Sequence, residues 1–234
     1  MTTPTPSTPR AMVQTILASL PDALPTSLST TGRAPSKGDD IYEAYLFALV
    51  LKAARAQGYS ISVQNPDGSP ATSLHLRRGP GRLTSVGATS RPFTHAVLRT
   101  GTRPDLELHT GIRIVGKSLV LHEADVLLIP AADADRCRAA LVDPPSRTAH
   151  LVIEAKYYTQ PVTISTGREF LGLRKDLSAK NMSFVSTVAG ASATALLAAT
   201  STVEYDTGVL PGAPGEAGFE EYAKRLLRDY RSRR

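Results

Sequence analysis

The sequence predicts an α/β protein with a central mixed sheet flanked by helices. Three observations lead to this class. A long apolar helical pattern comes first, a series of short apolar segments divided by Gly- and Pro-rich turns follows, and helical and strand patterns then alternate toward the C-terminus. Segments 118–130 and 149–158 are apolar on nearly every residue, which is typical of strands covered on both faces.

The N-terminal part contains the clearest helix, predicted over 39–58. Asp39 or Asp40 can cap its start and Gly58 its end, and the apolar stretch from 44 to 51 indicates that it is buried. A short amphipathic helix is predicted over 10–20. The Thr- and Pro-rich residues 1–9 predict a disordered tail without the features of a signal peptide.

The middle of the chain is predicted to be rich in strands, with a β-rich insertion over 60–100. Gly and Pro turns such as NPDGSP and TGTRPD separate the segments. The polar segment 131–148 is expected to be an insertion with one helical turn around Cys137. The expected strands are 60–64, 73–77, 93–99, 106–115, 118–130 and 149–158.

The C-terminal part predicts a helix, a strand and two further helices. These elements span 166–179, 182–188, 191–199 and 216–231. No repeat and no clear boundary divides the chain, so residues 10–234 are expected to form one domain. Its core would be 39–188, with a basic C-terminal helix at 216–234.

Charge and composition favour a polyanionic partner. The 234 residues carry 27 Lys and Arg against 21 Asp and Glu, a net charge of +6. Cys137 is the single cysteine, which excludes an intramolecular disulfide and fits a reducing cytoplasm. The apolar runs are too short to span a bilayer, so we expect a cytoplasmic protein with no membrane partner. No Walker or dinucleotide-binding motif is present.

Two predicted central strands carry charged residues at alternate positions. Glu154 and Lys156 share one face of LVIEAK, and Glu123 and Asp125 share one face of HEADVLLI. Charged groups in such apolar strands are costly unless they pair or bind a metal. Paired carboxylates are suitable ligands for Mg²⁺ or Mn²⁺, and Lys156 could position an attacking water. The Ala155 carbonyl is a further candidate ligand.

These residues resemble the motif of the PD-(D/E)XK nuclease superfamily, in which an Asp on one core strand precedes Glu-x-Lys on the next. The resemblance covers roughly 39–188, with the expected helix–strand–strand–strand–helix–strand order. Ala124 stands where the named motif has Pro. The resemblance implies a restriction-endonuclease-like fold, metal binding by Asp125 and Glu154, and catalysis assisted by Lys156. Glu43 lies where such nucleases often add a helical Glu.

The resemblance also implies a substrate and a setting. We expect cleavage of DNA, with double-stranded DNA favoured, in bacterial restriction or antiphage defence. Arg168, Arg174 and Lys175 lie on the helix that commonly touches the DNA backbone in such nucleases. Cutting a duplex usually takes two sites, so a homodimer or higher oligomer is expected. The absence of a recognisable specificity domain suggests an activating protein or ligand.

Several alternatives stay open. Glu154 and Lys156 could mark an exposed edge strand, Glu43 could complete a capping box with Asp40, and Glu123 is expected to be a solvated flank. The basic residues of 166–179 could form an ordinary solvated face. The chain could also be a non-catalytic nucleic-acid-binding or scaffold subunit on a nuclease-like fold. No zinc site is expected, because the spacing of the histidines matches no metal-ligand motif; these are His95, His109 and His150.

Overall fold

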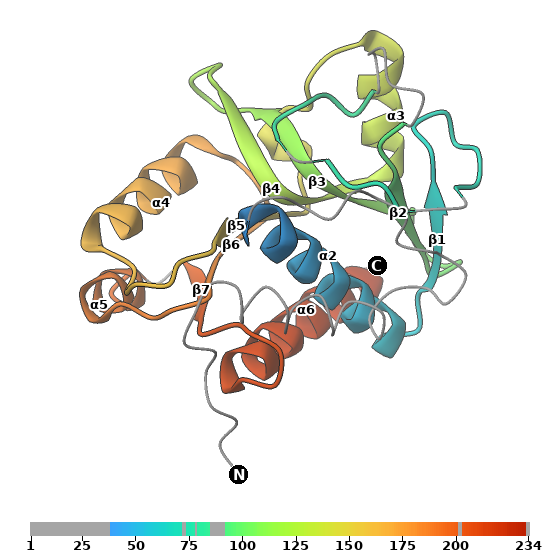
Figure 1. The fold of residues 1–234 in the computed structure, drawn as a ribbon. Helices are drawn as coiled ribbons and strands as arrows, with labels where there is room; N and C mark the ends of the chain where they lie inside the picture. Colours follow the sequence, from blue (N-terminus) through green and yellow to red (C-terminus); the bar gives the residue numbers. More distant parts are fainter. Residues whose placement is uncertain (1–37, 72–73, 78, 85–91, 201–202, 233–234) are drawn as a thin grey trace.

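The computed structural model describes residues 38–71, 74–77, 79–84, 92–200 and 203–232. It contains a seven-stranded mixed sheet in the order β1-β2-β3-β4-β5-β6-β7, with helices on both faces (Figure 1). The predicted α/β class with a flanked mixed sheet is therefore confirmed. The strands are β1 (Ser60–Gln64), β2 (His95–Arg99), β3 (Leu106–Val115), β4 (Leu121–Pro130), β5 (Leu151–Lys156), β6 (Asn181–Ser186) and β7 (Glu204–Thr207).

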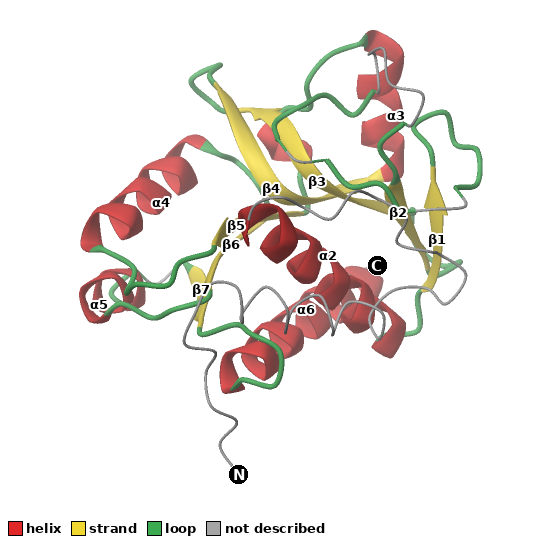
Figure 2. Ribbon diagram, in the orientation of Figure 1, coloured by secondary structure: helices red, strands yellow, loops and turns green. Residues whose placement is uncertain are grey.

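The strand directions follow from the lengths of the connections. Strands β1 to β5 pair antiparallel with their sequence neighbours, whereas β5, β6 and β7 are parallel. Parallel neighbours need a crossover, and helices α4 (Ile164–Asp176) and α5 (Ala191–Ala198) lie in the β5–β6 and β6–β7 connections. Figure 2 shows these two helices side by side.

The sheet divides the hydrophobic core into two layers, one on each of its faces. Helices α2 (Gly38–Ala56) and α6 (Pro214–Ser232) pack together over one face, which contains Phe47, Leu128 and Phe219. The other face packs against α4, α5 and α3 (Ala131–Ala140) and contains Phe170 and Phe184. Helix α2 is apolar nearly all round because it contacts both the sheet and α6.

Some boundaries differ from the expected ones for local reasons. Residues 74–77 form no strand, because the amides of His75 and Arg77 are satisfied by the hydroxyls of Thr94 and Thr110 at 2.8 and 3.2 Å. The segment around Cys137 is a ten-residue helix instead of one turn. The short polar strand β7 was not predicted.

Two expectations about the first half of the domain also need correction. Segment 60–100 is not a separate β-rich insertion, because it contributes β1 and β2 to the central sheet. Helix α2 begins at Gly38, so Asp39 and Asp40 lie in its first turn instead of at the cap, where they still favour the positive end of the helix dipole. The predicted tail 1–9 and helix 10–20 lie outside the described residues.

Across the described ranges, every helix is too short or too polar to cross a bilayer.

Candidate catalytic site and a second polar cluster

Strand pairing brings Asp125 to the Glu-x-Lys segment of β5. The β4–β5 ladder ends where Val126 pairs with Ile153, so Asp125 and Glu154 are the next residues of the two strands. Asp125 Oδ2 accepts a hydrogen bond of 2.7 Å from the backbone amide of Ala155. The structure therefore places the Asp125 carboxylate against β5, beside Ala155, whose carbonyl is a candidate metal ligand.

The side-chain alternation of β4 is interrupted at Asp125. Ala124 lies in the core layer of α4 and α5, whereas Val126 lies in the opposite layer, although regular alternation would place both on one face. On β3, Leu108 and Ile112 change layers in the same way across Gly111, whose φ is 58°. The expected regular alternation through Asp125 is therefore wrong, because both strands change their facing at this point.

Lys156 and Glu154 form a close ion pair. Lys156 Nζ lies 2.5 Å from Glu154 Oε1, and the side chains are 26 % and 16 % exposed. Burial acts to lower the pKa of Lys156, but Glu154 and Asp125 outweigh it and raise the pKa above its usual value. Lys156 is therefore held as a cation at the end of β5.

Carboxyl groups outnumber cations around this pair. Burial raises the pKa of Glu43 to about 9, with further contributions from Asp125 and Glu123. Burial and then Glu154 raise the pKa of Asp125 to about 7, against the opposing hydrogen bond from Ala155. The pKa of Glu123 is also raised, by burial and then by Glu154. Glu123 thus belongs to the cluster and is not the solvated flank that was expected.

Helix α2 brings Glu43 to this end of the sheet. Gly38, the first residue of the helix, lies so close to the ring of Tyr157 that a Cβ atom would clash with it. Tyr157 directly follows β5, and its ring also packs against Tyr42 at a centroid distance of 6.1 Å. These contacts hold the first turns of α2 next to the Glu-x-Lys strand. The capping-box alternative for Glu43 fails, because Asp40 lies inside the helix.

The predicted DNA-contacting residues all lie on α4, which follows β5 in the chain. Arg168 and Lys175 are exposed, and Arg174 is partly buried. Their role in binding nucleic acid stays a prediction.

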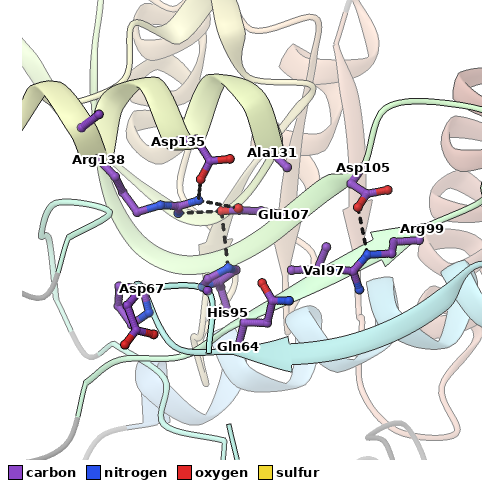
Figure 3. Close-up of a pocket in the computed structure, with 13 residues that line it drawn as sticks. Gln64, Asp67, His95, Val97, Arg99, Asp105, Glu107, Ala131, Asp135 and Arg138 are labelled. Carbon is purple, nitrogen blue, oxygen red and sulfur yellow. Dashed lines mark hydrogen bonds and ion pairs between the residues drawn. The ribbon is translucent and has the colours of Figure 1, made fainter. Parts of the chain in front are cut away.

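A second polar cluster lies between β2, β3 and α3. Register pairs Val97 with Glu107 and Ala96 with Leu108, so His95 comes opposite His109. The imidazole rings stack with centroids 4.7 Å apart, and His109 Nε2 lies 2.9 Å from Glu107 Oε2. Arg138 of α3 binds Glu107 through both terminal nitrogens, at 2.6 and 2.8 Å (Figure 3).

The second cluster is deeply buried. His95, Glu107 and His109 are 2 %, 3 % and 5 % exposed. Burial and then the neighbouring His109 lower the pKa of His95 to about 3. Burial would raise the pKa of Glu107, but the hydrogen bonds from Arg138 and His109 lower it well below its usual range. Glu107 is therefore an ionised carboxylate beside a neutral imidazole.

The two clusters differ in how closely their ligand atoms converge. In the described ranges, one group of at least three His, Cys, Asp or Glu side chains brings its ligand atoms within 4.8 Å of one another. This group consists of His95, Glu107 and His109. We expected no zinc site from the spacing of His95, His109 and His150, but the fold brings His95 and His109 together with Glu107, and His150 is not part of this group. The overlooked signal was Glu107-x-His109, which places two ligands on one face of a strand.

Comparisons with protein-family models, curated proteins and solved structures found no match to the chain.

Proposed function

We propose that the protein is a metal-dependent nuclease whose catalytic site comprises Asp125, Glu154, Lys156 and Glu43. The observation that carries the proposal is the meeting of Asp125 with the Glu-x-Lys segment, through the 2.7 Å hydrogen bond to Ala155. Helix α2, strands β3, β4 and β5, helix α4 and strand β6 occur along the chain in the order that the PD-(D/E)XK resemblance implies, with β1 and β2 after α2 and α3 between β4 and β5.

The residues of this site fit a hard divalent cation. Asp125 and Glu123 are influenced by Glu154 and by the ammonium of Lys156, and Glu43 is influenced by Asp125 and Glu123. Burial first, and then the neighbouring carboxylates, raise the pKa values of Glu43 and Asp125, so a bound cation would favour their ionised forms. Oxygen ligands of this kind suit Mg²⁺ or Mn²⁺, and binding such an ion would displace protons from the carboxyl groups.

Each side chain has a distinct proposed role. Asp125 and Glu154 would hold the metal, with Glu43 and the Ala155 carbonyl completing the site, and the ion would supply charge stabilisation at the phosphate and an acidified water. Lys156, held as a cation by Glu154, would orient the attacking water and stabilise charge on the phosphoryl oxygens. The reaction is hydrolysis of a phosphodiester bond, with double-stranded DNA as the favoured substrate.

The decisive experiment measures cleavage of plasmid DNA by the full chain with Mg²⁺ or Mn²⁺. Lys156→Ala should reduce the cleavage rate at least about 100-fold, as expected for the loss of a charge-stabilising group. Lys52→Ala is the matched control. Lys52 of α2 also forms an ion pair with a glutamate, Glu220 of α6, at 2.7 Å, but it lies outside the Glu-x-Lys segment. Equal cleavage by wild type and Lys156→Ala would refute the assignment.

A parallel binding measurement separates catalysis from DNA binding. Lys156→Ala should still bind duplex DNA, whereas Arg168→Ala and Lys175→Ala should weaken binding and reduce its dependence on salt. Binding without metal-dependent cutting by the wild type would favour the non-catalytic binding subunit. The same samples, examined by sedimentation with and without duplex DNA, test the expected homodimer or higher oligomer.

A further inference from the structure

We propose that His95, Glu107 and His109 form a second metal site, for a divalent transition metal of the zinc type. The three side chains present two imidazole nitrogens and one carboxylate oxygen from adjacent strands. Their candidate ligand atoms all lie within 4.8 Å of one another. This set is chemically distinct from the all-oxygen site at Asp125 and Glu154, because imidazole ligands favour zinc and its neighbours over magnesium.

The distances already approach those of a coordinated ion. Zinc binds imidazole nitrogen and carboxylate oxygen at about 2.0–2.2 Å, so two ligands of a tetrahedral ion lie about 3.3 Å apart. Glu107 Oε2 lies 2.9 Å from His109 Nε2 and 3.6 Å from His95 Nε2, which brackets that separation. The two imidazole rings stack with 20° between their planes, so they would have to tilt toward each other for both Nε2 atoms to reach one ion.

His95 provides the independent sign that a ligand is expected here. Its Nε2 atom is buried and makes no hydrogen bond, since Glu107 lies beyond hydrogen-bonding range at 3.6 Å. A buried polar atom left without a hydrogen-bond partner destabilises the folded state. A metal ion bound between His95 Nε2, His109 Nε2 and Glu107 Oε2 would satisfy this atom.

Arg138 is compatible with a metal because of how it holds the carboxylate. Its Nη2 atom donates to Glu107 Oε1 at 2.6 Å, and this contact can persist when an ion binds. Its Nη1 atom donates to Glu107 Oε2 at 2.8 Å, and a metal bound to Oε2 would replace this second contact. Hydrogen bonding of a metal-binding carboxylate by an outer partner is common in metal sites. Arg138 would also offset the charge of Glu107 in the metal-free protein, which explains how the cluster stays folded without an ion.

A cavity gives access to the cluster from one side. Its volume is about 460 Å³, and His95, Glu107, Arg138 and Asp135 line it (Figure 3). A site with three protein ligands leaves one coordination position for water or another small ligand. We therefore expect an ion that exchanges with solution, and not one enclosed permanently during folding.

The test uses tag-free full-length protein in a Glu154→Gln background, with excess Mg²⁺ to occupy the remaining carboxylates. After chelation, the protein is titrated with Co²⁺ and Zn²⁺, and cobalt absorption and bound zinc are measured. One equivalent with a visible cobalt spectrum is expected. His95→Gln and His109→Gln should each weaken binding at least about 10- to 100-fold. His122→Gln is the matched control, because His122 also contacts a carboxylate, Asp176 at 2.7 Å.

Three outcomes would overturn the site. These are no retained zinc in the parent protein, equal binding by the His95 and His109 variants, and an equal loss in the His122 control. Circular dichroism identifies any variant that fails to fold. X-ray absorption of the zinc-loaded parent then decides without a substitution at the cluster: imidazole scattering supports the site, and a shell of oxygen alone refutes it. Because Glu154→Gln disables the proposed nuclease, this result is independent of cleavage activity.

Discussion

Replacing Glu43 by Gln should stabilise the metal-free protein, and the gain should increase with pH. The folded environment raises the pKa of Glu43 to about 9 from an ordinary value of 4.5. Between these values the folded state binds more protons than the unfolded state, so stability falls as pH rises. Gln resembles the neutral acid in shape and does not titrate, so the variant escapes this loss.

The size of the effect follows from the shift in pKa. If the whole shift applied, ionisation of Glu43 would lower the free energy of unfolding at pH 7 by about 3 kcal/mol, because pH 7 lies about 2.5 pH units above the ordinary pKa of 4.5. The side chain is only partly buried, so solvent screening and local relaxation reduce this figure. We expect Glu43→Gln to raise the free energy of unfolding by about 1 to 2 kcal/mol at pH 7, and by almost nothing at pH 4.5.

Urea denaturation with a chelator at pH 5, 7 and 8.5 measures this difference directly. The measurement is then repeated with Mg²⁺, which should stabilise wild type more than the variant, because an ionised Glu43 helps to hold the ion. Glu43→Ala serves as a comparison that removes the side chain as well as the charge. A free-energy difference between wild type and Glu43→Gln that is independent of pH would refute the buried-carboxylate account.

Three further predictions concern the fold around the two clusters. Glu107→Gln should lower the free energy of unfolding by about 3 kcal/mol in denaturant titrations, because Arg138 loses its buried partner and is left with the ion pair to the exposed Asp135. A change below about 1 kcal/mol would contradict the importance of the Glu107 pairing. Gly190→Ala should destabilise by about 1–3 kcal/mol or more, because the new Cβ would meet the Val162 carbonyl, and an unchanged melting temperature would exclude this clash. Phe184 of β6 is fully buried and packs against Phe170 of α4, so Phe184→Ala should lower the free energy of unfolding by about 3–5 kcal/mol in the same assay. A smaller loss would show that the surrounding core collapses into the space left by the ring.

Local patterns were sufficient for most of the elements and for the centre of the proposed catalytic site. The apolar stretch of helix α2 and the apolar strands β3 to β6 follow from residue periodicity and turn composition. Asp125, Glu154 and Lys156 were found because charged residues within such strands are unusual. Their strands also follow one another along the chain, so neighbouring positions in the sheet could be anticipated.

Tertiary structure decided which other residues join each cluster. Alternation already placed Glu123 on the face of Asp125, but it predicted neither the change of facing at Asp125 nor the burial that raises the pKa of Glu123. His95 and His109 meet only because one particular register pairs β2 with β3. Sequence periodicity specifies which side of a strand a residue occupies. Register, twist and the placement of α3 depend on packing across the whole sheet, and they determine which buried polar groups share one environment.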